Sequence, residues 1–202
     1  MSRTNLSVWK ETITTTGFIV INILLFGISA FSGDLLYNEG AFSLRYILQG
    51  QEWWRFITAM FLHANMDHLV GNMLMLYVAG ELVEKYVGKW KFAILYFFSG
   101  ISGSMLYAAY EFSTGSFRDS IGASGAVFGV IGALLVIVIR HRGKYADITI
   151  GRMIFMIVYM MYMGLRASNV NNAAHIGGLL GGMVLTVFYM LIGNGDSGRR
   201  YE

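Results

Sequence analysis

One serine and one histidine occupy matching places in this sequence, each at the start of a hydrophobic segment. Ser124 lies in a Gly-Ala-Ser-Gly string at positions 122–125, and His175 follows an alanine at the start of a later segment. A hydroxyl beside an imidazole can act as a nucleophile in acyl transfer, because the ring takes its proton. Ionisable groups are costly in hydrocarbon, so those found there usually have a function. The pair predicts hydrolytic chemistry inside a membrane.

The composition is that of an all-α membrane protein. Of the 202 residues, 55% are hydrophobic and only 13% are charged, and the mean hydropathy is +0.55. Soluble domains carry about 25% charged residues. The 25 glycines lie within apolar segments, which indicates close contacts between helices rather than a flexible linker. We therefore expect a bundle of membrane-spanning helices.

Two missing residue types exclude several kinds of chemistry and structure. The sequence contains no cysteine, which excludes disulfides, thiolate metal sites and cysteine nucleophiles. It contains no proline, so helix ends must come from Gly, Asn, Ser or Asp. The net charge of +3 is modest and indicates membrane topology rather than a nucleic-acid partner. We expect no metal and no cofactor.

Apolar runs predict six transmembrane helices in a single domain that covers residues 1–202. Each run is near the roughly 20 residues that a helix needs to cross a bilayer. The fourth run is short, so we expect its start to lie below the membrane surface. A short segment, 1–16, precedes the first helix, and a tail, 193–202, follows the last. The predicted helices cover about 17–32, 66–83, 91–112, 124–139, 148–165 and 173–192.

Basic residues alternate between the loops and indicate the orientation. Lys and Arg are enriched in the cytoplasmic loops of membrane proteins. In the loops on the other side, arginines are balanced by Asp and Glu. The alternation places both termini in the cytoplasm, and we expect the membrane to be a bacterial cell membrane. The residues that set this orientation are Arg3, Lys10, Lys85, Lys89, Lys91, Arg140, Arg142, Lys144, Arg199 and Arg200.

With that orientation, three predicted helices begin on the outer side with polar residues in or near their first turn. These residues are His68 and Asn72, then Ser124, then His175. Helix N-termini carry free N–H groups and a positive dipole end, which suit a developing oxyanion. His68 and Asn72 are four residues apart and therefore share a helix face. We expect an active site that opens to the outer side.

Each of these residues also has an ordinary explanation. A serine in an apolar helix often hydrogen-bonds a carbonyl one turn back, and Asn72 alone would be an interhelical hydrogen-bonding residue. The Gly-x-Ser-Gly string is a weak signal, because glycine and serine are common in membrane helices. The joint placement of Ser124 and His175 at one depth is what favours catalysis.

The fourth and sixth predicted helices each carry a stripe of glycines. Small residues let two helix backbones approach closely, so facing stripes would bring Ser124 and His175 together. Packing without catalysis predicts the same stripes. They consist of Gly122, Gly125, Gly129 and Gly132 in the fourth helix, and of Gly178 and Gly182, reinforced by Gly177 and Gly181, in the sixth.

A series of motifs runs along nearly the whole chain in a fixed order. It consists of Trp54-Arg55, His63, the pair His68 and Asn72, Gly80 with Glu84-Lys85, Gly122-Ala123-Ser124-Gly125, and Ala174-His175 followed by Gly178 and Gly182. In these residues and their order, the sequence resembles the rhomboid family of intramembrane serine proteases, in its basic six-helix bacterial form.

The resemblance implies a Ser–His dyad with Ser124 as the nucleophile and His175 as the base, and no carboxylate as a third member. It implies an oxyanion hole formed by His68, Asn72 and the amide of Ser124. Phe128 falls where the family has an aromatic ring stacked on the catalytic imidazole. The implied substrates are single-pass or polytopic membrane proteins in contact with membrane lipid.

Other matching residues have supporting roles. Arg55 and His63 lie in the first loop, where the resemblance implies that His63 braces the loop. His63 is five residues from His68, roughly 140° around a helix, so we do not expect the two to share a metal. Glu84 resembles a structural hydrogen-bonding residue at the inner end of the second helix.

Two other classes of function compete with the protease. A catalytically inactive rhomboid-like protein could bind membrane proteins, but such relatives usually lose one dyad residue, and this sequence has both Ser124 and His175. A channel or small transporter could bind an ion at polar helix ends. The sequence has neither an acidic relay nor an inverted repeat that would support a transporter.

Overall fold

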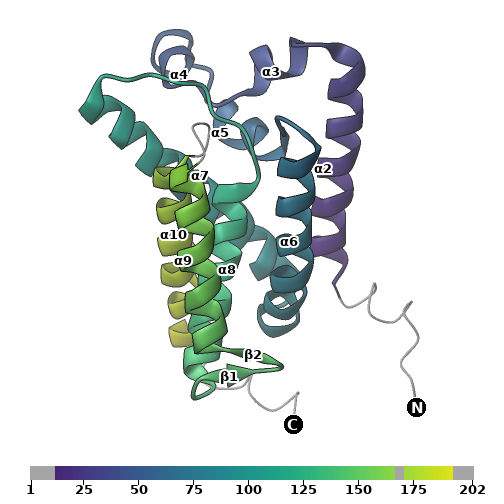
Figure 1. The fold of residues 1–202 in the computed structure, drawn as a ribbon, viewed down its shortest axis with the longest axis vertical. Helices are drawn as coiled ribbons and strands as arrows, with labels where there is room; N and C mark the ends of the chain where they lie inside the picture. Colours follow the sequence, from purple (N-terminus) through teal and green to yellow (C-terminus); the bar gives the residue numbers. More distant parts are fainter. Residues whose placement is uncertain (1–11, 167–170, 193–202) are drawn as a thin grey trace.

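The apolar runs of the sequence form long helices that lie side by side (Figure 1). The computed structural model describes residues 12–166 and 171–192, and this part of the chain is all-α apart from one short hairpin. The predicted segment 1–16 lies largely outside the described residues, and the tail 193–202 entirely so. The long helices are α2 (Ile13–Ser32), α6 (Met66–Val87), α7 (Lys89–Thr114), α8 (Ser124–Arg140), α9 (Ile150–Arg166) and α10 (Asn172–Ile192).

Three of the described helices, α2, α7 and α10, are long and apolar enough to cross a membrane by length and composition. Helix α8 is apolar but has only 17 residues. Helix α6 is long enough at 22 residues, but it carries Asp67, Glu81, Glu84 and Lys85. Charged side chains lower the mean hydropathy of a segment. Helix α6 is therefore more polar than a typical membrane-spanning helix.

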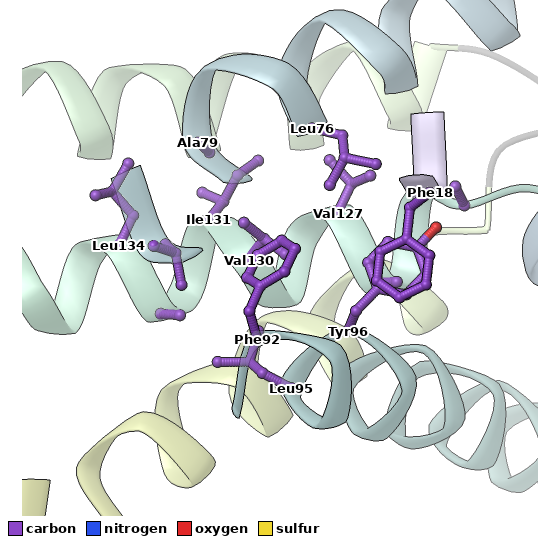
Figure 2. Close-up of a cluster of buried hydrophobic side chains, with 14 of the residues drawn as sticks. Phe18, Leu76, Ala79, Phe92, Leu95, Tyr96, Val127, Val130, Ile131 and Leu134 are labelled. Carbon is purple, nitrogen blue, oxygen red and sulfur yellow. The ribbon is translucent and has the colours of Figure 1, made fainter. Parts of the chain in front are cut away.

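Helix α8 is the central element of the bundle. Nearly every residue from Gly125 to Val138 is buried, and the helix packs against α6, α7 and α10. A helix that is apolar on all sides is stable when other helices surround it. Figure 2 shows side chains of α2, α6 and α7 converging on this helix. The labelled residues are Phe18, Leu76, Ala79, Phe92, Leu95, Tyr96, Val127, Val130, Ile131 and Leu134.

The connection from α2 to α6 contains short helices that the sequence analysis did not predict. They are α3 (Leu35–Gly40), α4 (Leu44–Gly50), α5 (Arg55–Thr58) and the 3-10 helix η1 (Ala59–Phe61). Arg55 holds them together, because its guanidinium donates to the carbonyl of Ala41 at 2.8 Å and to that of Asn38 at 2.9 Å. It also pairs with Glu52, and its side chain is only 3% exposed. Arg55 is therefore an internal anchor of the first loop.

The connection from α8 to α9 is a β-hairpin rather than a simple loop. Strands β1 (Lys144–Tyr145) and β2 (Ile148–Thr149) pair antiparallel, with Lys144 opposite Thr149. The predicted fifth helix began at residue 148, whereas α9 begins at Ile150. Ile148 is apolar and continues the hydrophobic run, so hydropathy alone could not separate the strand from the helix.

Glu84 fastens the start of α2 to α6. Its carboxylate accepts hydrogen bonds from the Thr14 amide at 2.9 Å and from the Thr15 amide and hydroxyl, each at 2.7 Å. The residue before α2, Thr12, provides no side-chain cap for this helix end. A carboxylate satisfies free N–H groups and suits the positive end of the helix dipole. Glu84, which is 1% exposed, thus caps a neighbouring helix.

We predict that Glu84→Gln lowers the free energy of unfolding by about 2–3 kcal/mol, because buried donors lose a charged acceptor. Glu81→Gln is the matched control one turn earlier on α6, where Glu81 pairs with Lys85 at a partly exposed position. Exposed ion pairs contribute about 0–1 kcal/mol, so this control should unfold almost like the wild type. Equal losses in both variants, measured by reversible unfolding in detergent, would contradict the capping role of Glu84.

Candidate active site

Helix α8 begins at Ser124, and the residue before it does not cap the N–H groups of its first turn. The preceding chain is held by backbone hydrogen bonds, in which the Gly122 amide donates to the Ala59 carbonyl at 2.9 Å. The N-cap residue of α8 is Ala123, whose methyl side chain cannot accept a capping hydrogen bond. The first N–H groups of a helix have no partner within the helix. The Ser124 amide is therefore available to an anion at the site of the hydroxyl.

The structure brings Ser124 and His175 together. The Ser124 Oγ and the His175 Nε2 lie 3.0 Å apart, and the serine hydroxyl donates when the imidazole is neutral and protonated on Nδ1. His175 is 7% exposed, whereas Ser124 is only half-buried. This is the separation that a proton transfer from a nucleophile to a base requires. The Ser124 side chain is thus partly exposed, whereas the His175 imidazole beside it is shielded.

An aromatic ring fixes the imidazole of His175. Phe128 lies one turn after Ser124 on the same face of α8, and its ring stacks on His175 with 4.2 Å between centroids and 10° between planes. The other ring nitrogen, His175 Nδ1, is buried and has no hydrogen-bond partner among the described residues. Stacking rather than a carboxylate therefore orients the imidazole in the part of the chain that the structure describes.

Glycines let α10 lie directly on α8. A Cβ built on Gly178 would overlap the carbonyl oxygen of Gly125, and one built on Gly182 would overlap that of Gly129. The backbones of the two helices are thus in contact at two successive turns. Small residues permit this approach in membrane helices. It brings the first turns of the two helices, and with them Ser124 and His175, within hydrogen-bonding distance.

Two details of the predicted glycine stripes are wrong. Gly177 and Gly181 face α7 rather than α8, since a Cβ on Gly177 would lie 2.7 Å from the Ser102 carbonyl oxygen and one on Gly181 would lie 2.8 Å from the Ser102 side chain. Gly122 precedes α8 instead of belonging to its stripe. Its φ of +130° disfavours side chains, and a Cβ there would lie 2.6 Å from His68 Cε1.

Helix α7 contributes a glycine that the sequence analysis missed. A Cβ on Gly103 would lie 2.6 Å from the carbonyl oxygen of Ala174, the residue before His175. Gly100 and Gly103 form a Gly-x-x-Gly spacing in α7, and this spacing could have predicted a helix contact there. Helix α10 is thus held in a slot between α7 and α8, both of which it contacts through glycine.

The two side chains expected in the oxyanion hole lie one turn apart on α6, which packs against α8. The ring of His68 lies against Gly122, two residues before Ser124. The Asn72 amide donates one proton to the His68 carbonyl at 3.0 Å, and an Asn side chain has a second N–H to give. Asn65 caps α6 by accepting from the His68 amide at 2.9 Å. Neither His68 nor Asn72 hydrogen-bonds Ser124 among the described residues.

His63 is not on a helix with His68, contrary to the angular argument made from the sequence. It lies in the loop between η1 and α6, and its ring centroid is 5.1 Å from that of His68. Burial, together with the nearby His68, lowers the pKa of His63 to about 4. His63 is therefore a neutral, buried ring that packs against His68. The described residues contain no group of three or more His, Asp or Glu side chains placed to hold a metal.

A model of the Rhomboid domain matches residues 50–192 of the chain. The chain belongs to the rhomboid family. The resemblance identified from the sequence is thereby confirmed, as is an all-α integral membrane protein, since rhomboid domains are polytopic and the chain has apolar helices of sufficient length.

Relatives of this rhomboid protein occur in bacteria and plants. The rhomboid protease GluP of Bacillus subtilis (strain 168) is 37% identical over 91% of this chain and 36% of its own length. The rhomboid protease AarA of Providencia stuartii is 33% identical over 70% of this chain and 57% of its own. RHOMBOID-like protein 6, mitochondrial, of Arabidopsis thaliana is 36% identical over 76% and 49%. The chain thus spans roughly a third to three fifths of the length of these relatives.

We predict that Gly178→Ala lowers the free energy of unfolding by about 1–3 kcal/mol, the usual cost of overpacking, because its methyl group would meet the Gly125 carbonyl. Gly27→Ala in α2 is the matched control, since a Cβ there meets nothing within 4 Å. The control should be neutral or more stable by up to about 1 kcal/mol. A Gly178→Ala protein that unfolds like the control would show that the two helices are not in backbone contact.

Proposed function

We propose that this rhomboid protein is an intramembrane serine endopeptidase that cleaves transmembrane segments of membrane proteins with a Ser124–His175 dyad. The observation that carries this proposal is the 3.0 Å separation of the Ser124 Oγ and the His175 Nε2 at the start of α8. Family membership and relatives that are named proteases support the same function.

In the proposed reaction, Ser124 attacks a peptide carbonyl of the substrate. His175 Nε2 takes the hydroxyl proton as the bond from Oγ to the carbonyl carbon forms. A helical peptide shields its carbonyls by hydrogen bonding, so the substrate helix must unwind near its outer end before the attack. The ring of His175 holds its orientation during the transfer because Phe128 is stacked on it.

The negative charge that develops on the carbonyl oxygen would be stabilised by three donors. These are the free amide of Ser124, the second N–H of Asn72 and the ring of His68. Collapse of the tetrahedral intermediate breaks the peptide bond, and the imidazolium returns its proton to the leaving amine. Water then attacks the acyl-enzyme with His175 again as the base, which releases the second product and restores Ser124.

We also propose that six helices, α2 and α6 to α10, cross the membrane in one domain that covers residues 1–202. Helix α6 has charged residues and helix α8 is short. Both could still lie in the membrane because other helices pack around them. The termini would be cytoplasmic in a bacterial cell membrane, and the site would open to the outer side. Of the basic residues that indicate this orientation, Arg3, Lys10, Arg199 and Arg200 lie outside the described residues.

The proposed substrates are single-pass or polytopic membrane proteins that reach the site through lipid. We propose no nucleic-acid partner, no metal and no cofactor, because the dyad and the N–H donors account for each step. A catalytically inactive membrane-protein binder would have the same fold and the same Gly178 contact with α8. Activity alone separates these two functions.

The test is cleavage of a reporter that carries one transmembrane helix, by purified protein in detergent or vesicles. The wild type should cleave it, and Ser124→Ala and His175→Ala should each lose activity by at least about 1,000-fold, as expected when a member of a catalytic pair is removed. All three proteins should have similar unfolding curves. Cleavage by Ser124→Ala at the wild-type rate would refute the proposal, and an inactive wild type that still binds the reporter would favour the inactive binder.

A second variant tests the oxyanion hole. Asn72→Ala should lower kcat by about 10–100-fold with little change in KM, because its N–H would bind the oxygen chiefly in the transition state. Its control is Asn22→Ala in α2, another buried asparagine, whose amide donates to the Phe18 carbonyl of its own helix. If both variants retain wild-type kcat, Asn72 is a packing residue and has no part in the site.

A further inference from the structure

The segments that lead into the two dyad residues are joined by a hydrogen bond between two side chains. Ser120 lies four residues before Ser124, and Asn171 lies four residues before His175. The side-chain amide of Asn171 donates to the Ser120 hydroxyl oxygen at 3.2 Å. This hydrogen bond therefore connects the entry to α8 directly with the entry to α10.

Asn171 is fixed in place because it caps α10. Its Oδ1 accepts from the Ala174 amide at 2.9 Å, and its carbonyl accepts from the His175 amide at 3.2 Å. A side-chain oxygen that accepts from the third residue of a helix is the usual N-cap geometry. Asn171 thus moves as one unit with the first turn of α10, which carries His175.

Ser120 is fixed at the other end of the bond. Its amide donates to the Phe42 carbonyl at 3.0 Å, and its carbonyl accepts from the Phe42 amide at 2.9 Å. Two residues later, the Gly122 amide donates to the Ala59 carbonyl. The chain from Ser120 to Ser124 is therefore attached to the first loop and has little freedom to shift.

The position of α10 along the axis of α8 matters as much as their distance. Contacts at Gly178 and Gly182 set how closely α10 lies on α8, and a hydrogen bond between the entries to the two helices adds a restraint at the end that carries the dyad. A shift of about 1 Å along that axis would separate Ser124 from His175 and can cost on the order of 100-fold in rate.

We infer that the Asn171–Ser120 hydrogen bond sets the axial register of α10 on α8, so that both are positioning residues for the dyad. The expected effect on kcat rests on the proposed function. The expected effect on the distance between Ser124 and His175 rests on the geometry alone. Neither side chain contacts Ser124 or His175 through its own polar atoms, so both act through the segments that they hold.

The kinetic test uses variants that break the bond in different ways. Asn171→Ser keeps a capping oxygen but is too short to reach Ser120, and Ser120→Ala removes the acceptor while leaving the cap intact. Each should lower kcat by about 10–100-fold at unchanged KM. The double variant should lose no more than either single variant, because both changes break the same bond. Asn171→Asp should keep near wild-type kcat, since the Ser120 hydroxyl can donate to the carboxylate and the cap remains.

A crystal structure of Ser120→Ala supplies a readout that does not require activity. The inference expects the distance between Ser124 Oγ and His175 Nε2 to lengthen beyond about 3.5 Å, past hydrogen-bonding reach. Wild-type kcat in both single variants, additive losses in the double variant, or an unchanged dyad distance would each overturn the inference. If the wild type cleaves no faster than Ser124→Ala, the proposed function fails, and the crystallographic distance still decides the inference about register.

Discussion

The geometry of this rhomboid protein depends on direct backbone contact between α8 and α10. Side chains at the contact would hold two helix axes about 8–10 Å apart. Glycine at positions 178 and 182 removes that spacer, so the carbonyls of Gly125 and Gly129 lie where side chains would otherwise be. The hydrogen bond between Ser124 and His175 follows from this contact, because the two residues stand in the first turns of the same two helices. Ser124 can then reach His175 although neither side chain is long.

The site combines this close packing with polar groups whose bonds lie within the protein. In hydrocarbon an unsatisfied polar group costs several kcal/mol, so each buried one must have a partner or a use. Glu84 is satisfied by the start of α2, and Arg55 by carbonyls of the first loop. The proposed reaction would use the amide at the start of α8 and one N–H of Asn72. Some other buried polar atoms, such as the Tyr96 hydroxyl and the Ser99 hydroxyl, have no hydrogen-bond partner among the described residues.

The sequence predicted the long helices well, because their hydrophobic pattern is a local property. Their observed bounds differ from the predicted ones by only a few residues, and α6 and α7 end next to Gly88 and Gly115, in keeping with a chain that has no proline. The resemblance also named Ser124, His175 and Phe128, which the structure brings into contact. These residues could be recognised because each lies within a motif of a few neighbouring positions.

What the sequence did not predict depends on contacts between distant segments. The short helices of the first loop depend on Arg55 reaching Ala41 and Asn38. The ring contact of His63 with His68 arises because the chain turns before α6 begins, and a helical angle could not foresee it. The packing of three helices also determines which neighbour each glycine of α10 faces. The hydrogen bond from Asn171 to Ser120 likewise depends on that packing.

The central claim is that packing, rather than a third catalytic residue, makes Ser124 a nucleophile through His175. The most direct measurement is intact-protein and peptide mass spectrometry after treatment of the folded protein with a fluorophosphonate, which reacts with activated serines. The account predicts one adduct per chain, located on Ser124, and its loss in His175→Ala at unchanged unfolding. An adduct of equal yield in His175→Ala, or none on Ser124 in a folded wild type, would contradict it.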